Sequence, residues 1–181
     1  MMMKSRTSSA KKQKGNQLLF VLLALVIGGV VLAVGVNQYQ DAENKASVQE
    51  TVGQVNTIIG NAKQNFGQYA YAGITTSIAI GSRVIPDSLS TSPTTAVNKF
   101  GGAVTFADNG ATNAGTGLLT YQNVPAESCV AIVNGTQALA RRVIVGTTDV
   151  KPLDGTINVA TLNAQCTAAA NTSIGWVTGR T

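Results

Sequence analysis

Apolar residues follow two different patterns in the first 66 residues of the chain. From Leu18 to Val36 there are 19 residues without an ionisable side chain. A helix of that length spans about 30 Å, the thickness of the hydrocarbon core of a bilayer. From Val48 to Phe66 apolar residues recur at alternating spacings of four and three, the period of one helix face. The first proline is Pro86, so we expect one helix of about 50 residues, apolar on all sides at first and one-sided afterwards.

The residues after this helix alternate short β-prone runs with turn-rich stretches. We expect strands over 74–80, 103–107, 117–123, 142–146 and 173–178, helices over 126–133 and 158–169, and a surface loop over 87–95. A long helix followed by several strands predicts an α+β domain, with an antiparallel sheet laid against the amphipathic half of the helix. Trp176, the only tryptophan, is expected in the core.

Charge divides the chain at Gly15. Five of the 13 Lys and Arg residues and no acid precede this glycine, which leaves eight bases and eight acids for residues 16–181. The basic leader is expected to stay cytoplasmic and to place the later residues outside the cytoplasm. A domain of zero net charge, whose only basic pair is Arg141–Arg142, lacks the basic surface of a nucleic-acid-binding protein. We interpret that pair as solvated or as a subunit contact, with a DNA or anion site as the less favoured alternative.

Three fates are possible for the apolar segment: it is cut off, kept as an anchor, or kept and reused. A secretory signal would be cut near Ala33 and Gly35. The apolar run is longer than a usual signal core, and the helical period continues past the site of such a cut to Phe66. A removable signal gives no reason for this continuation.

Cys129 and Cys166 are the only cysteines. In an oxidising compartment a lone pair usually forms a disulfide. Closing this loop of about 37 residues would stabilise the fold by roughly 4 kcal/mol. The alternative is two buried free thiols in a cytosolic protein. A metal site is disfavoured, because the chain has no histidine and no CxxC motif.

No enzyme or cofactor site is predicted. General acid–base chemistry needs positioned titratable groups, and among the eight carboxylates only Asp41 and Glu43 lie close in sequence. Phosphate-binding and nucleophile-elbow motifs are lacking, and Gly101-Gly102 is better explained as a turn than as a binding loop.

The leader ending in Lys14-Gly15, the apolar run directly after it and the amphipathic continuation resemble a type IV prepilin. The resemblance implies cleavage between Gly15 and Asn16 by the prepilin peptidase, N-methylation of Asn16, and retention of the apolar helix. It divides the chain into a leader (1–15), an apolar transmembrane or filament-core half-helix (16–36), an amphipathic half-helix (37–68) and a globular α+β domain (69–181).

Three later segments resemble the type IVb subgroup, the bundle-forming pilins of enteric bacteria especially. Residues 84–87 and 98–104 are similar to its αβ-loop and first strand, and residues 126–132 to the short helix that carries its first disulfide cysteine. The resemblance implies a disulfide-bounded region over 129–166, closed by Cys129 and Cys166.

One position departs from this family. The fifth mature residue is usually a glutamate, thought to pair with the N-terminal amine of a neighbouring subunit, and here it is Phe20. The first mature residue is Asn16, where the family favours an apolar residue. A carboxylate buried in an apolar bundle costs free energy unless it is paired. The absence of a glutamate at this position removes that cost, and it also removes a contact that could align neighbouring subunits.

The resemblance implies a structural subunit of a type IV pilus. It would be held in the inner membrane before assembly and then polymerised through its apolar helix into an extracellular filament. Its partners would be copies of itself, the prepilin peptidase, the assembly machinery and a host or recipient cell surface, in adhesion, aggregation or conjugation. Two alternatives remain: a minor or tip adhesive pilin lacking the glutamate, and a secreted or anchored periplasmic protein with no filament role.

Overall fold

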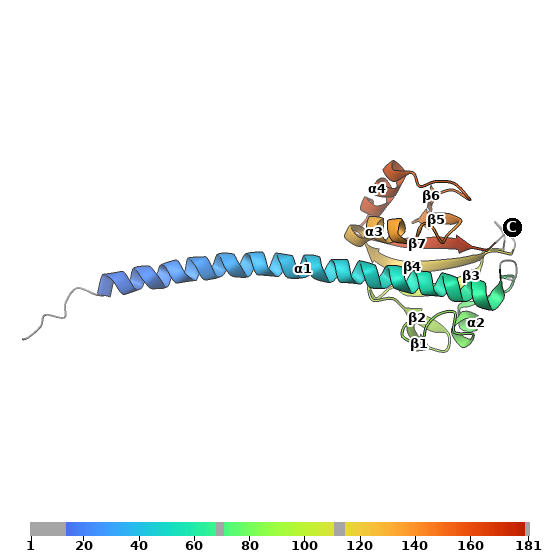
Figure 1. Ribbon diagram of the computed structural model, residues 1–181, viewed down its shortest axis with the longest axis horizontal. Helices are drawn as coiled ribbons and strands as arrows, with labels where there is room; N and C mark the ends of the chain where they lie inside the picture. Colours follow the sequence, from blue (N-terminus) through green and yellow to red (C-terminus); the bar gives the residue numbers. More distant parts are fainter. Residues whose placement is uncertain (1–13, 68–70, 111–114, 180–181) are drawn as a thin grey trace, which may run out of the picture. The chain divides into compact units, whose positions relative to one another are not determined.

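The computed structural model describes residues 14–67, 71–110 and 115–179, without the side chains of 14–18 and 30–40. The chain divides into two compact units, one up to Glu43 and one from Asn44 onward. The first unit contributes the start of helix α1 (Lys14–Phe66), and the second contains the rest of that helix and the other elements (Figure 1). The long continuous helix predicted from the apolar period is confirmed.

The buried face of α1 in the second unit is shifted from the predicted stripe. Val55, Ile59 and Ala62 are fully buried as expected, whereas Val48, Val52 and Phe66 are only half-buried. Ile58 and two hydroxyl residues, Ser47 and Thr51, complete the buried face. The Thr51 hydroxyl donates to the Ser47 carbonyl oxygen at 2.8 Å, so this buried polar group has a hydrogen-bond partner within the helix.

Within the described residues, seven strands form one sheet in which every pair is antiparallel, in the order β1-β2-β3-β4-β7-β5-β6. The strands are β1 (Ser90–Ser92), β2 (Thr95–Val97), β3 (Ala103–Asp108), β4 (Gly117–Pro125), β5 (Arg142–Val145), β6 (Thr148–Lys151) and β7 (Asn171–Thr178). The predicted α+β class with an antiparallel sheet is therefore confirmed.

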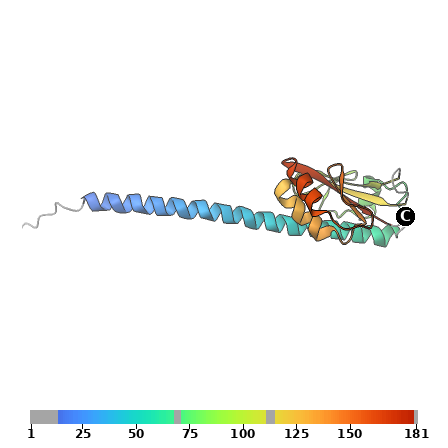
Figure 2. The ribbon, with the colours of Figure 1, turned by 90° about the horizontal axis from the view of Figure 1, so that it is seen from above.

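In the part of the chain that the structure describes, three short helices accompany the sheet: α2 (Thr76–Gly81), α3 (Ala126–Thr136) and α4 (Val159–Thr167). Figure 1 shows α2 beside β1 and β2 at one end of the sheet, and α4 beside β5 and β6 at the other. Seen from above, α3 lies beside the second half of α1 (Figure 2). A Cβ at Gly135 of α3 would stand 2.8 Å from Val52 Cγ2 of α1, so glycine permits this close approach.

The core between the helices and the sheet contains four large aromatic side chains, all fully buried. They are Tyr71, Phe106, Tyr121 and Trp176. The rings of Tyr121 and Trp176 meet edge-on at 5.6 Å, and those of Tyr71 and Phe106 lie 6.0 Å apart, both within the range of favourable aromatic pairs. The core position predicted for Trp176 is confirmed.

Two of the predicted elements are wrong. Residues 74–80 were expected to form a strand, but they contain helix α2, which begins where the Thr75 hydroxyl accepts a hydrogen bond from the Ile78 amide. Ala79 and Ile80 are adjacent and both buried, a pattern that a helix end allows and a half-buried strand does not. The surface loop expected over 87–95 holds β1 and the start of β2.

Candidate functional site

The described side chains in the apolar part of α1 are exposed in the single chain. Every residue from 19 to 29 is exposed. Among the large apolar residues the exposed fraction ranges from 54% for Leu22 to 67% for Leu19 and Leu25. Exposed apolar surface of this extent marks a site of contact with another protein or with lipid. This part of the chain is therefore the first candidate for a functional surface.

Phe20 belongs to this surface, and 66% of its side chain is exposed. Residues 1–13 of the expected leader lie outside the described residues. Gly15 and Asn16, the expected cleavage and methylation positions, lie in α1, but their side chains are outside the description. In the part of the chain that the structure does describe, none of the helices has a stretch long and apolar enough to cross a membrane.

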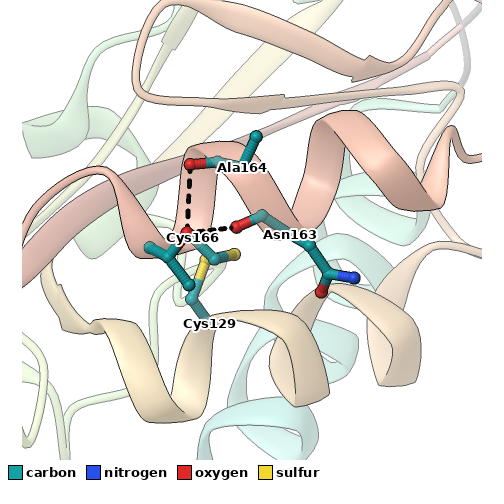
Figure 3. The surroundings of a disulfide bond; sticks show 5 residues. Cys129, Asn163, Ala164 and Cys166 are labelled. Atoms are coloured by element: carbon teal, nitrogen blue, oxygen red, sulfur yellow. Dashed lines mark hydrogen bonds between the residues drawn. A yellow bond between two sulfur atoms is a disulfide. The ribbon is translucent and has the colours of Figure 1, made fainter.

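The second candidate is the region bounded by the two cysteines. Cys129 of α3 and Cys166 of α4 form a disulfide, and both residues are fully buried (Figure 3). One residue after Cys166, the Thr167 hydroxyl donates to the carbonyl oxygens of Asn163 and Ala164, at 2.8 and 3.4 Å. The two cysteines are 37 residues apart in sequence, so the bond ties α4 to α3 and closes a loop that contains β5 and β6.

Two lysines hold the C-cap of α3 and the turn that follows it. Lys151 of β6 donates to the carbonyl oxygens of Gln137 and Ala140, both at 2.7 Å. Lys63 of α1 donates to the carbonyl oxygen of Leu139 at 3.2 Å. Gln137 caps the C-terminus of α3, where a cation interacts favourably with the helix dipole, and the other two carbonyl oxygens belong to the turn after the helix.

Arg141 and Arg142 each form an ion pair within the same domain. Arg142 binds Asp149 through two hydrogen bonds, at 2.6 and 2.8 Å. Arg141 binds Asp154, with Nε 2.8 Å from Oδ1. The hydrogen bond from Arg141 lowers the pKa of the Asp154 carboxyl group, and the same bond raises the pKa of Arg141. The two guanidinium groups are thus engaged by internal carboxylates, a partnership that the sequence analysis missed.

No acid–base centre is assembled among the described residues. Tyr121 is fully buried, its hydroxyl has no hydrogen-bond partner within the described part of the chain, and burial raises its pKa. Desolvation also raises the pKa of Tyr71. Within the residues described, no three His, Cys, Asp or Glu side chains lie close enough together to hold a metal ion.

A shallow depression of about 560 Å³ lies beside Asp149, with walls from β6 and the start of α4. Its lining residues are Asp149, Pro152, Thr156, Ile157, Asn158 and Thr161. The one carboxylate in it is already bound by Arg142, and the Asn158 side chain caps α4 by accepting from the Thr161 amide at 3.0 Å. The side chains of Asp149 and Asn158 therefore serve the local fold.

The Gly101-Gly102 turn agrees with the sequence interpretation. Gly101 has a φ of +76°, a conformation that favours glycine, and its amide donates to the Asn98 carbonyl oxygen at 3.0 Å. A Cβ on Gly102 would collide with the backbone of Gln122 in the neighbouring strand. The two glycines are required by the turn and by strand packing.

Comparison with known proteins identifies one matching family. The family model PilS, described as PilS N terminal, matches residues 32–179. Among solved structures, the crystal structure of TcpA, a type IV pilin from Vibrio cholerae El Tor biotype, is similar, with a TM-score of 0.47 and 12% identity. The match covers 76% of this chain and 99% of that one. No curated protein matches the chain.

Proposed function

Because the chain belongs to the PilS family of type IV pilins, we propose that it is the structural subunit of a type IV pilus, polymerised through the apolar half of α1. In this proposal the leader is removed after Gly15, Asn16 becomes the methylated first residue, and the subunit waits in the inner membrane before joining an extracellular filament. The mature chain then has an apolar helix (16–36), an amphipathic half-helix (37–68) and a globular domain (69–181).

The continuity of α1 carries the proposal. The helix runs from Lys14 to Phe66 through the cut sites of both alternatives, near Gly15 and near Ala33. Cleavage near Ala33 would discard about two fifths of its 53 residues, whereas cleavage after Gly15 keeps nearly all. The exposed apolar side chains at 19–29 would then be satisfied by lipid before assembly and by neighbouring subunits afterwards. Contacts of this kind are head-to-tail and open, so they produce fibres.

The disulfide region has a separate role in this proposal. The domain that contains it would face outward in the filament, and the Cys129–Cys166 bond would keep α4 attached when the filament is exposed to shear or denaturing conditions. The oxidising compartment that such a bond requires agrees with export of the domain.

N-terminal sequencing and mass measurement of the cellular protein test the cleavage. We expect a start at Asn16 and the mass of one added methyl group, and a Gly15→Leu variant should keep its leader. Ala33→Leu is the matched control, and it should be processed normally. A start near Val34 or Val36, blocked by Ala33→Leu and not by Gly15→Leu, would show a secreted protein and overturn the proposal.

Phe20 favours a second candidate, a minor or tip adhesive pilin. A subunit without the family's glutamate lacks one means of pairing with the N-terminal amine of its neighbour. Electron microscopy of a deletion strain separates the two candidates, because loss of the bulk filament identifies a major subunit. Filaments of normal number that no longer adhere identify a tip subunit.

The apolar surface itself can be tested at Phe20. If subunits associate by apolar contact at this position, Phe20→Lys buries an unpaired ammonium group and should sharply reduce filament yield, whereas Phe20→Leu should be tolerated. Equal yields from the two variants would show that Phe20 does not face neighbouring subunits in the filament.

A further inference from the structure

We propose that Asn109 is a site of spontaneous modification, where attack by the Gly110 amide nitrogen converts the asparagine to aspartate and isoaspartate. This chemistry requires an asparagine followed by a residue that does not shield its own amide nitrogen, and glycine shields it least. The chain has two Asn-Gly pairs in its described residues, Asn109-Gly110 and Asn134-Gly135, and one Asp-Gly pair, Asp154-Gly155. The structure distinguishes Asn109 from the other two.

Asn109 directly follows strand β3, outside regular structure, and Gly110 is exposed. The Gly110 amide donates to Asp108 Oδ1 at 2.9 Å, so the proton that must leave the nitrogen before attack already contacts a carboxylate. The other oxygen of that carboxylate accepts from the Gly73 amide, also at 2.9 Å, which fixes its orientation. The Asn109 side-chain amide contacts Thr116 Oγ1 at 3.2 Å.

Asn134 is more exposed than Asn109, so access to water alone would predict the opposite order of reactivity. It lies inside helix α3, where the Gly135 amide donates to the carbonyl oxygen four residues earlier. The helical backbone also points this nitrogen along the helix axis and away from the Asn134 side chain. Attack at Asn134 therefore needs local unfolding of the helix.

Asp154 is protected for a different reason. Cyclisation at an aspartate expels hydroxide or water, and it proceeds through the protonated carboxyl group. Arg141 binds this carboxylate and lowers its pKa, so the protonated form is scarce near neutral pH. Asn109 is left as the reactive position of the three.

The reaction is balanced by solvent alone. The Gly110 nitrogen loses its proton and bonds to Cγ of Asn109, the Cγ–Nδ2 bond breaks, and ammonia leaves with that proton. Water then opens the resulting five-membered imide at either carbonyl, which gives aspartate or isoaspartate. Each conversion of Asn109 adds one negative charge at neutral pH. Because residues 16–181 contain eight bases and eight acids, their net charge changes from zero to −1.

Peptide mapping measures the reaction in the full chain. Trypsin cuts after Lys99 and next after Arg141, so both Asn-Gly pairs lie in one peptide. The extent of reaction at Asn109 can therefore be compared with that at Asn134 in the same peptide. During incubation of the folded protein in detergent at mildly alkaline pH, we expect a gain of about one dalton at Asn109, about tenfold or more faster than at Asn134. In denaturant with reductant, the two rates should converge.

Gly110→Ala is the direct test, because a Cβ there would stand 3.5 Å from the nearest atom of Asp108 and fits without strain. It should slow the reaction at Asn109 several-fold and leave Asn134 unchanged, with the thermal midpoint preserved. Asp108→Asn tests the carboxylate independently and should also slow the reaction. Equal rates at Asn109 and Asn134 in the folded chain, or an unchanged rate in Gly110→Ala, would overturn the proposal.

Discussion

The hydrogen bond from Trp176 to Thr136 connects the centre of the sheet to helix α3, and its removal is the sharpest test of how the domain is held together. Trp176 Nε1 lies 2.8 Å from Thr136 Oγ1, and both residues are fully buried. The same hydroxyl donates to the Ile132 carbonyl oxygen at 2.7 Å. Thr136→Val keeps the shape of the side chain and removes both bonds, together with a longer one from the same hydroxyl to the Val133 carbonyl oxygen at 3.4 Å.

The two lost bonds differ in consequence. The Ile132 carbonyl oxygen keeps the hydrogen bond it receives within the helix, so losing the threonine donor costs little. The indole N–H is left buried without an acceptor, which costs about 1 to 3 kcal/mol. In Trp176→Phe, which lacks this donor, Thr136→Val should cost about 0.5 kcal/mol or less. The coupling energy between the two positions is therefore expected to be about 1 to 2 kcal/mol.

Denaturant unfolding of the full chain in detergent measures these free energies. Far-ultraviolet circular dichroism is the appropriate signal, because Trp176→Phe removes the only tryptophan. Thr57→Val is the matched control, since the Thr57 hydroxyl makes the same intrahelical bond, 2.8 Å to the Gly53 carbonyl oxygen, at an exposed site. The reasoning is refuted if Thr136→Val costs no more than Thr57→Val, or costs the same with and without the indole.

Three further predictions concern the same domain. Replacing both cysteines with alanine should lower the free energy of unfolding by about 4 kcal/mol for a 37-residue separation. When both proteins are measured under reducing conditions, this difference between the variant and the wild type should disappear. Asp154→Asn should destabilise the protein near neutral pH. Because the folded pKa lies below the unfolded value, the difference from wild type should vanish as the pH falls through the folded pKa in an acid titration; a constant difference would contradict the pairing with Arg141. Gly135→Ala should cost about 1 kcal/mol by crowding Val52, and in a Val52→Ala background it should become stabilising in denaturant titrations.

The helix and most of the sheet could be predicted because their sequence periods are strong. The spacing from Val48 to Phe66 sustains one helical face over five intervals, and no proline interrupts it. Strands β3, β4, β5 and β7 contain long β-prone runs bounded by glycine, proline or asparagine. In these elements local preference and tertiary packing agree.

The errors occur where packing overrides local preference. Residues 74–80 are rich in threonine and isoleucine, which favour strands, but the Thr75 cap and the burial of Ala79 and Ile80 stabilise a helix there. The Ser and Thr residues of 90–95 signal a loop in sequence. They form a hairpin of β1 and β2, and this hairpin is stabilised because β2 also pairs with β3, with Ala96 opposite Val104.

The ion pairs of Arg141 and Arg142 could not be predicted from spacing. Their partners, Asp154 and Asp149, lie 13 and 7 residues away across a hairpin whose register the sequence does not reveal. The disulfide could be predicted, because a single pair of cysteines leaves one pairing within the chain.

The place of β7 in the sheet has a consequence for biosynthesis. β7 lies between β4 and β5, and both of these strands precede it in the chain. Until residues 171–178 have been synthesised and delivered, β1 to β4 and β5 to β6 are two separate sheets with unpaired edges. Those edges are exposed to wrong pairing with other chains in the meantime. Closure also joins segments distant in sequence, which makes it slow. A partner that shields the edges of β4 and β5 until β7 pairs with them would therefore raise the yield of folded protein.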